Sequence, residues 1–262
     1  MKQFYNLKLW LCIVLVIIMS DNSLAQNNEN SKKTGSHAGV DIANTEPLLV
    51  KKCSEFEITG NGSDPEWNKT KWAVLTQLDQ GGGNYASKFK IMYSDKGIYI
   101  LFQGQDEKIT TEDYEDMDAL WNGDVFEAFF HPDPQKGKYY EYEVNPMGKQ
   151  IVITLFKSEE GLVSWIPMNK QNRKSYGVES KVEISGGKME LDSKITSWRA
   201  EMFLSYKSMG LIPNIPPKSG ATWNANFCRL DYDYGKMIKW SWSPTIEKSF
   251  HELEKFRSIK FE

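Results

Sequence analysis

Short runs in which apolar and polar residues alternate dominate the chain from about residue 46 onward, and they constrain its fold most strongly. Successive side chains of a β-strand point to opposite faces, so this alternation predicts strands that bury one face. Glycine, proline, asparagine and aspartate separate the runs, as is typical of turns. The alternating runs are Ser87–Tyr93, Gly97–Gln103, Val125–His131, Tyr139–Asn145, Lys149–Phe156, Gly177–Ile184, Lys188–Asp192, Ser197–Leu204, Ala221–Leu230 and Lys236–Trp242.

So many short strands at this spacing predict an all-β protein, an antiparallel two-sheet β-sandwich with jelly-roll-like form. Tyr206–Leu211 is the only helical candidate and amounts to one short turn. Pro213, Pro216 and Pro217 follow it, and proline prevents a helix from continuing.

The first 45 residues have a different character. Lys2 and Lys8 precede an apolar run, and the small residues of Ser23–Ala25 follow it. This order predicts a signal peptide over residues 1–25 and therefore a secreted or periplasmic protein. The run is too short to span a bilayer comfortably, so we expect no transmembrane segment in the mature chain. Residues 26–45 are polar and aperiodic, which predicts a disordered linker, and residues 46–262 then form one domain.

Charge and cysteine content exclude some classes of function. The net charge is −3 and no basic stripe could follow a phosphate backbone, which argues against nucleic-acid binding. Cys53 and Cys228 could form a disulfide in an exported protein or remain two separate buried thiols, and both interpretations stay open. No CxxC motif and no histidine cluster suggests zinc. The oligomeric state stays open as well.

The stretch from Trp121 to Pro146 carries the candidate binding chemistry. If Phe126 faces the core, the alternation places Glu127 on the opposite face of its strand, and it places Glu143 and Asn145 on the matching face of the next strand. A sugar offers an apolar C–H face that packs on an aromatic ring and hydroxyls that bond to carboxylates and amides. Trp121, at the strand entry, could supply that ring or could instead plug the end of the core.

Four motifs in order resemble the family 9 carbohydrate-binding modules and their secreted relatives. They belong to a wider superfamily of sugar- and haem-binding β-sandwich domains. The motifs cover roughly the whole mature domain and are Gly62–Trp67, Met92–Ile100 followed by Asp106, Trp121–Glu127, and Trp240–Pro244 with Phe250–Phe256. The resemblance implies a two-sheet sandwich that binds an oligo- or polysaccharide.

In that family, two aromatic rings clamp the terminal sugar of a chain and polar side chains bind its hydroxyls. By this resemblance, Trp121 and Phe250 supply the rings, and Glu127, Glu143 and Asn145 the polar contacts. The sequence departs from the family at two of these positions. Phe250 stands where a tryptophan is expected, and Glu143 where an arginine is expected. The ligand is therefore expected to differ from that of the family.

Other interpretations of the acidic residues remain. Glu127 could form a buried ion pair with Arg199 or Arg229. Calcium prefers several oxygen ligands, so the acidic loop before Trp121 is a candidate calcium site, although a solvated charge run is the simpler interpretation. No other cofactor is expected. The acidic residues of this loop are Asp113, Glu115, Asp116 and Asp118.

The leading hypothesis is a secreted, non-catalytic protein that clamps a sugar chain terminus and supports polysaccharide catabolism. One alternative is a glycoside hydrolase of the kind associated with xylanases, with Glu127 and either Asp124 or Glu143 as its two carboxylates. The other is a haem-binding electron-transfer domain with Met147 and His131 as conceivable axial ligands. No CxxCH motif supports this last alternative.

Overall fold

A computed structural model describes residues 46–244, 246 and 249–262, which belong to one compact unit. The predicted signal peptide (1–25) and linker (26–45) lie outside the described residues. Within the described part of the chain, no helix is long and apolar enough to cross a membrane.

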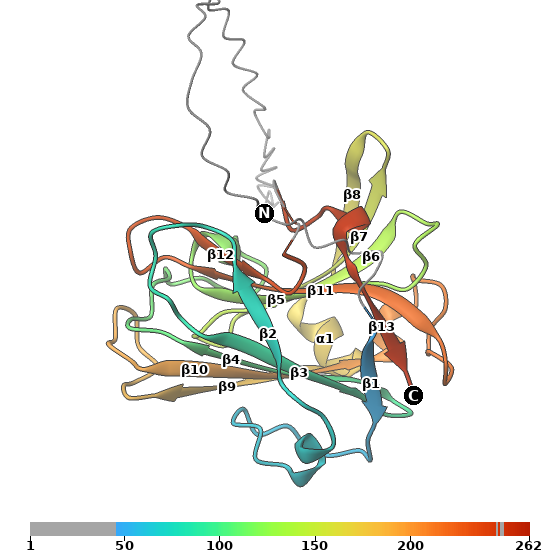
Figure 1. Ribbon diagram of the computed structural model, residues 1–262, viewed down its shortest axis with the longest axis horizontal. Helices are drawn as coiled ribbons and strands as arrows, with labels where there is room; N and C mark the ends of the chain where they lie inside the picture. Colours follow the sequence, from blue (N-terminus) through green and yellow to red (C-terminus); the bar gives the residue numbers. More distant parts are fainter. Residues whose placement is uncertain (1–45, 245, 247–248) are drawn as a thin grey trace, which may run out of the picture. The chain divides into compact units, whose positions relative to one another are not determined.

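The described residues form thirteen strands arranged in two layers (Figure 1). The main strand order of the first layer is β8 (Gly161–Pro167), β7 (Gln150–Ser158), β6 (Lys138–Val144), β5 (Val125–His131), β11 (Thr222–Asp231) and β12 (Ile238–Ser241). In this layer β11 also pairs with β13 (Arg257–Phe261). The order of the second layer is β2 (Ala73–Gln77), β3 (Ser87–Tyr93), β4 (Gly97–Gln105), β10 (Ser197–Ser205) and β9 (Val178–Ser185).

Two strands belong to both layers. In β2, Gln77 pairs with β12 of the first layer and Ala73 with β3 of the second. In β1 (Leu48–Lys52), Leu48 pairs with β13 and Lys51 with β3, and both of these pairings are parallel. The prediction of an all-β sandwich is therefore confirmed, but the prediction that it is antiparallel is wrong for β1. No hairpin joins β1 to either neighbour, so turn geometry does not impose an antiparallel direction on it.

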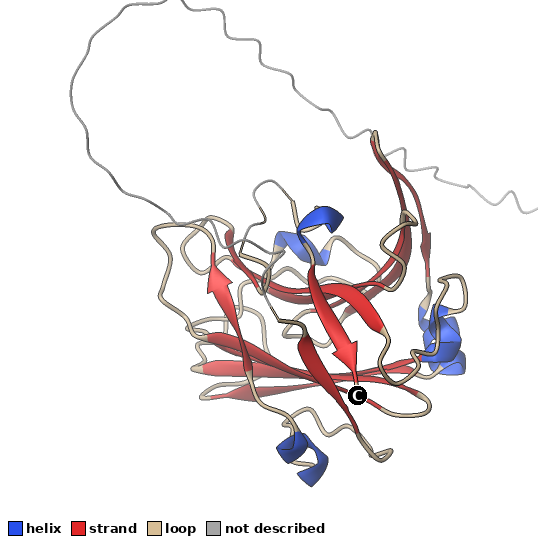
Figure 2. Cartoon of the chain, turned by 45° about the vertical axis from the view of Figure 1, so that its right-hand side comes forward, coloured by secondary structure: helices blue, strands red, loops and turns tan. Residues whose placement is uncertain are grey.

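The core lies between the layers and is rich in aromatic rings. Phe89 of the second layer stacks on Phe227 of the first with ring centroids 3.9 Å apart, and Phe102 stacks on Phe126 at 4.7 Å. Phe126 shares this core with its alternate neighbours Ala128 and Phe130, as the alternation predicts. The opposite face of β5 is thereby left for other contacts. Figure 2 shows the strands of the first layer curving over the second.

The helical content exceeds the single turn predicted from the sequence. Tyr206–Met209 does form a 3₁₀ turn, but α1 (Lys170–Tyr176) was not expected. The Asn169 side chain accepts a hydrogen bond from Asn172 N at 2.9 Å, and Gly177, at φ 70°, ends the helix in the left-handed region. Further 3₁₀ turns are η2 (Pro65–Lys69), η3 (Leu120–Asn122) and η5 (Leu253–Lys255).

The predicted strand Lys188–Asp192 is a turn. Asp192 adopts a φ of 59°, which is incompatible with an extended strand, and its N–H donates to Ile109 O. The alternation of residue types in this segment therefore does not correspond to a β-strand.

A carboxylate anchors the segment that precedes β2 onto the outer face of the second layer. Glu201 of β10 is fully buried, and its Oε2 accepts from the backbone of Thr59, Gly60 and Gly62 at 2.7–3.3 Å. Its Oε1 accepts from Trp67 Nε1 at 2.7 Å. Trp67 packs there with an apolar cluster that includes Tyr99.

The two cysteines of the domain are separate buried thiols. Cys53 donates to Tyr93 O at 3.3 Å, whereas Cys228 lies beside Ser241 in the first layer. Burial raises the pKa of Cys53 to about 12 and that of Cys228 well above its usual value. Of the two interpretations left open by the sequence, the structure matches separate thiols.

Candidate functional site

A pocket of about 490 Å³ opens on the outer face of the first layer, where β5, β6 and β7 form its floor. Apolar and aromatic side chains surround a group of three carboxyl groups. The lining residues are Met117, Trp121, Glu127, Glu141, Glu143, Ile151, Ile153, Leu155, Leu162, Trp165, Leu230, Met237, Lys239, Ser249, Phe250 and His251.

Strand register brings the three carboxyl groups of the floor together. Glu127 of β5 lies directly opposite Glu143 of β6, and Glu141 lies two residues along β6 on the same face. All three residues are almost fully buried, with at most 3% of their surface exposed. The face assigned to Glu127 and Glu143 from the alternation thus matches the structure.

Burial raises the pKa of each of these carboxyl groups. For Glu127 the charge of Glu141 raises it further, and no basic residue opposes the shift. The pKa of Glu143 is raised by burial, by the charges of Glu127 and Glu141 and by a hydrogen bond to Glu141. The same hydrogen bond and His251 partly offset the rise at Glu141.

Two exposed tryptophans lie at the wall of the pocket. Trp121, in η3, is 48% exposed, and Tyr232 Oη donates to its carbonyl at 2.7 Å, which holds the turn in place. Trp165, on β8, is 57% exposed and pairs with Leu155, another lining residue. Large indoles left this accessible beside a pocket are suited to contact a ligand.

The segment after β12 lines another side of the pocket. Phe250 is 8% exposed and packs against Phe129 at a centroid distance of 6.5 Å, so only its rim reaches the pocket. His251 Nδ1 lies 2.8 Å from Tyr139 Oη. Lys239 Nζ lies 3.9 Å from Asp79 Oδ1. The pocket therefore carries more acidic than basic groups.

Four of the five residues proposed from the sequence line this pocket: Trp121, Glu127, Glu143 and Phe250. Asn145 does not line it. Its Oδ1 accepts from Met147 N at 3.1 Å and Lys149 N at 2.8 Å, so it stabilises the turn between β6 and β7.

The sequence reasoning missed Glu141 and Trp165. Glu141 lies on the same face of its strand as Glu143 but was not chosen as a binding residue. Trp165 lies in an exposed edge strand that was not predicted, although Leu162–Ile166 is a β-prone run after the turn at Gly161.

The arginines considered as partners for Glu127 pair with other residues. Arg199 lies 3.5 Å from Glu183, and Arg229 pairs with Asp106 and Asp231. Glu127 is therefore not part of either ion pair.

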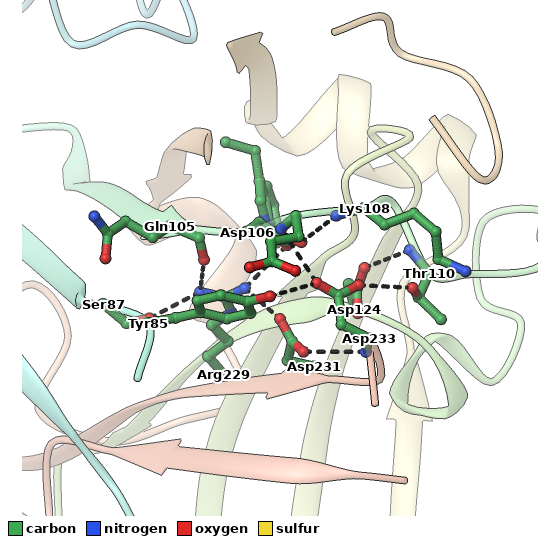
Figure 3. A network of polar contacts seen from close by, with 12 residues as sticks. Tyr85, Ser87, Gln105, Asp106, Lys108, Thr110, Asp124, Arg229, Asp231 and Asp233 are labelled. Carbon is green, nitrogen blue, oxygen red and sulfur yellow. Dashed lines mark hydrogen bonds and ion pairs between the residues drawn. The ribbon is translucent and has the colours of Figure 1, made fainter. Parts of the chain in front are cut away.

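Arg229 organises a buried polar network between the layers, drawn in Figure 3. It donates to Ser87 Oγ at 3.0 Å and Gln105 O at 2.6 Å in the second layer, and to Asp106 at 2.9 Å. Asp124, weighed above as a catalytic carboxylate, accepts from the N–H groups of Thr110 and Tyr232 and does not line the pocket. These contacts are structural.

One group of carboxylates in the described residues is close enough to share a metal ion, and it belongs to this network. Its members are Asp106, Asp231 and Asp233. Arg229 already supplies the positive charge there, and Tyr85 Oη donates to Asp233 at 2.9 Å. The acidic loop before Trp121 is engaged differently. Asp116 binds Arg173 at 2.6 Å and Asp118 accepts from Glu115 N at 2.7 Å.

The residues considered as haem ligands lie at opposite ends of the β5–β6 hairpin. His131 ends β5 beside the connecting loop, where it contacts Lys136 O, and Met147 follows the far end of β6. They do not form an axial pair.

The protein is a β-sandwich with an open pocket on one sheet, and exposed indoles and buried carboxyl groups line that pocket. These features are typical of a ligand-binding domain. The sequence profile described as "Carbohydrate family 9 binding domain-like" matches residues 58–204, more than half of the chain. The chain belongs to this family.

Solved structures share the fold at low sequence identity. A Bacteroides uniformis ATCC 8492 protein regarded as carbohydrate-binding is 17% identical with a TM-score of 0.67, and the match covers 83% of this chain and 99% of that one. A family 9 carbohydrate-binding module from Caldicellulosiruptor kristjanssonii in complex with glucose is 16% identical with a TM-score of 0.57, covering 83% and 96%. A family 9 module from the same organism in complex with cellotriose is 15% identical with a TM-score of 0.57, and the match covers 83% of this chain and 94% of that one. No protein of curated function matches the chain significantly in sequence.

Proposed function

We propose that this protein is a non-catalytic carbohydrate-binding protein that holds a saccharide in the pocket above β5, β6 and β7. The observation that carries the proposal is the pair of exposed indoles, Trp121 and Trp165, beside three buried carboxyl groups. Family membership supports it, because the C. kristjanssonii module binds glucose and cellotriose.

The chemistry of binding follows from the lining. The apolar C–H face of a sugar packs on an indole and leaves water. Hydroxyl groups then reach the floor, where a carboxylate accepts and a protonated carboxyl donates. Buried hydrogen bonds with charged groups are stronger than neutral ones, so the floor orients the ring. We further propose that the bound unit is a chain terminus, clamped between Trp121 and Phe250 or Trp165.

The arrangement of the acids favours binding over hydrolysis. A glycosidase places two carboxyl groups on either side of the bond, about 5–5.5 Å apart in retaining enzymes and about 6.5–9.5 Å apart in inverting ones. Glu141 and Glu143 instead lie on the same face of β6, and Glu127 lies beside them on β5. The three acids form one floor, so we propose no catalytic step and no cofactor.

Replacing Trp121 by alanine tests the site. About half of an indole surface, on the order of 100 Å², is available to a ligand. At about 25 cal/mol per Å² its loss weakens binding by about 1.5–2.5 kcal/mol, roughly 10- to 70-fold in Kd. Calorimetry with cell-wall oligosaccharides measures this. Tyr176→Ala, an exposed ring on α1 outside the pocket, is the matched control. If Trp121→Ala binds as tightly as the parent, the site is wrongly assigned, and release of reducing sugar by the parent would indicate a hydrolase.

We also propose that the protein is exported, to the periplasm or the medium, and supports polysaccharide catabolism there. The signal-like order of residues 1–25 supports export. Mass spectrometry of the protein recovered from cells tests it, because cleavage after Ala25 leaves Gln26 as the first residue.

A further inference from the structure

The pocket contains more acidic than basic side chains. Three carboxyl groups form its floor, and no arginine lines it. The basic residues at its edge are Lys239, which lies 3.9 Å from Asp79, and His251, which contacts Tyr139. Neither forms an ion pair with Glu127, and His251 only partly offsets the raised pKa of Glu141.

The floor also has hydrogen-bonding capacity that the protein does not fill. The Oε2 atoms of Glu141 and Glu143 are buried, and no described residue donates to them. An unfilled buried acceptor destabilises the folded protein, and more so when it is charged. A ligand that brings donors, and above all a positive charge, relieves this cost most.

The walls suit such a ligand as well. The face of an indole attracts a cation within about 6 Å, and the same face packs against the C–H groups of a pyranose. Trp121 and Trp165 can therefore pack against the sugar ring and attract its ammonium group at the same time. An anionic sugar would bring a like charge to a floor of three carboxyl groups and is disfavoured.

We propose that the pocket recognises an amino sugar, a pyranose with a free primary ammonium group, in preference to neutral or acidic sugars. The ammonium group lies among Glu127, Glu141 and Glu143, and the ring packs on an indole. This inference rests on the proposed carbohydrate-binding function and specifies its ligand.

Calorimetry with three β-1,4-linked trimers of similar size tests the inference. The probes are the trimers of glucosamine, N-acetylglucosamine and glucose, at pH 6, where the free amine is charged, and at low salt. We expect the glucosamine trimer to bind at least tenfold tighter than the other two. We also expect its affinity to fall at high salt, because ion pairs are screened.

Variants distinguish the charge effect from loss of the site. Glu141→Gln keeps the size of the side chain but removes a charge, so it should reduce the preference for glucosamine to threefold or less. Glu179→Gln, on β9 of the other layer, is the control and should leave the preference unchanged. Equal melting temperatures establish that both variants fold.

The outcomes separate the two proposals. If the glucose trimer binds as tightly as the glucosamine trimer and Trp121→Ala weakens both, the carbohydrate site stands and the amino-sugar inference fails. If no trimer or other saccharide binds, the proposed function fails, and the inference with it. If Glu141→Gln retains the full preference, the floor carboxyl groups do not cause it and the inference is overturned.

Discussion

Glu201 offers the sharpest prediction about how this domain is held together. Its carboxylate is fully buried and accepts from three backbone N–H groups and from the Trp67 indole N–H. The substitution Glu201→Gln keeps the shape but replaces one acceptor oxygen by an amide donor. If the remaining oxygen faces the backbone, the new NH₂ group meets the Trp67 N–H, and if it faces Trp67, three backbone donors lose their acceptor.

The cheaper arrangement loses one charge-assisted hydrogen bond and buries two donors against each other. Each buried unsatisfied group costs about 1–3 kcal/mol, so the free energy of unfolding should fall by about 3 kcal/mol. In a domain of this size, 1 kcal/mol corresponds to about 2–4 °C, so Tm should fall by about 6–12 °C.

Thermal unfolding followed by circular dichroism measures this loss. Glu183→Gln is the matched control, because Glu183 on the neighbouring strand pairs with Arg199 while partly exposed and should cost less than about 1 kcal/mol. Sugar binding should not change, since Glu201 lies in the other layer from the pocket. A Glu201→Gln variant that melts within 1 °C of the parent would show that these hydrogen bonds add nothing, and the reasoning would be refuted.

Three further predictions follow from the pocket and the thiols. The folded-state pKa values of the pocket carboxyl groups lie above the unfolded value of about 4.3, so the folded state binds more protons and Tm should decline as pH rises above about 4.3. Glu143→Gln removes one of these groups and should flatten that decline, whereas an unchanged slope would contradict the assignment. Trp165→Ala should weaken saccharide binding about as much as Trp121→Ala, roughly 10- to 70-fold by calorimetry, and an unchanged affinity would show that β8 is not part of the site. Cys53 and Cys228 should resist a thiol reagent in the native protein and react in denaturant, and rapid native reaction would contradict their burial.

The sequence predicts the β5–β6 hairpin and its two faces well for a physical reason. Each side of that hairpin meets a different environment, the core at Phe126 and the pocket floor at Glu127. Because of that difference, the glutamates of this hairpin lie on one face only, so residue type indicates which way a side chain points. The same alternation predicts that Glu127 and Glu143 lie close together, and in the structure they are directly opposite each other.

Elements whose two faces do not meet different environments are not predicted, or are predicted wrongly, from the sequence. Nearly every residue of β8 is exposed, so no apolar–polar period marks it. α1 has seven residues with only Arg173 buried, too short for a helical period, although Asn169 and Gly177 carry its end signals. The parallel pairing of β1 depends on strands distant in sequence, which local patterns do not encode.

The strands that belong to both layers determine how the two sheets can move relative to each other. Because β1 and β2 are each hydrogen-bonded to the first layer at one end and to the second at the other, neither sheet can slide over its partner without breaking backbone bonds. Amide hydrogens of both layers should therefore exchange through a common opening event, and the domain should melt in one step. The pocket above β5, β6 and β7 is correspondingly rigid. A sugar would therefore bind to a site that already has its bound conformation, and little binding free energy would be lost in ordering the site.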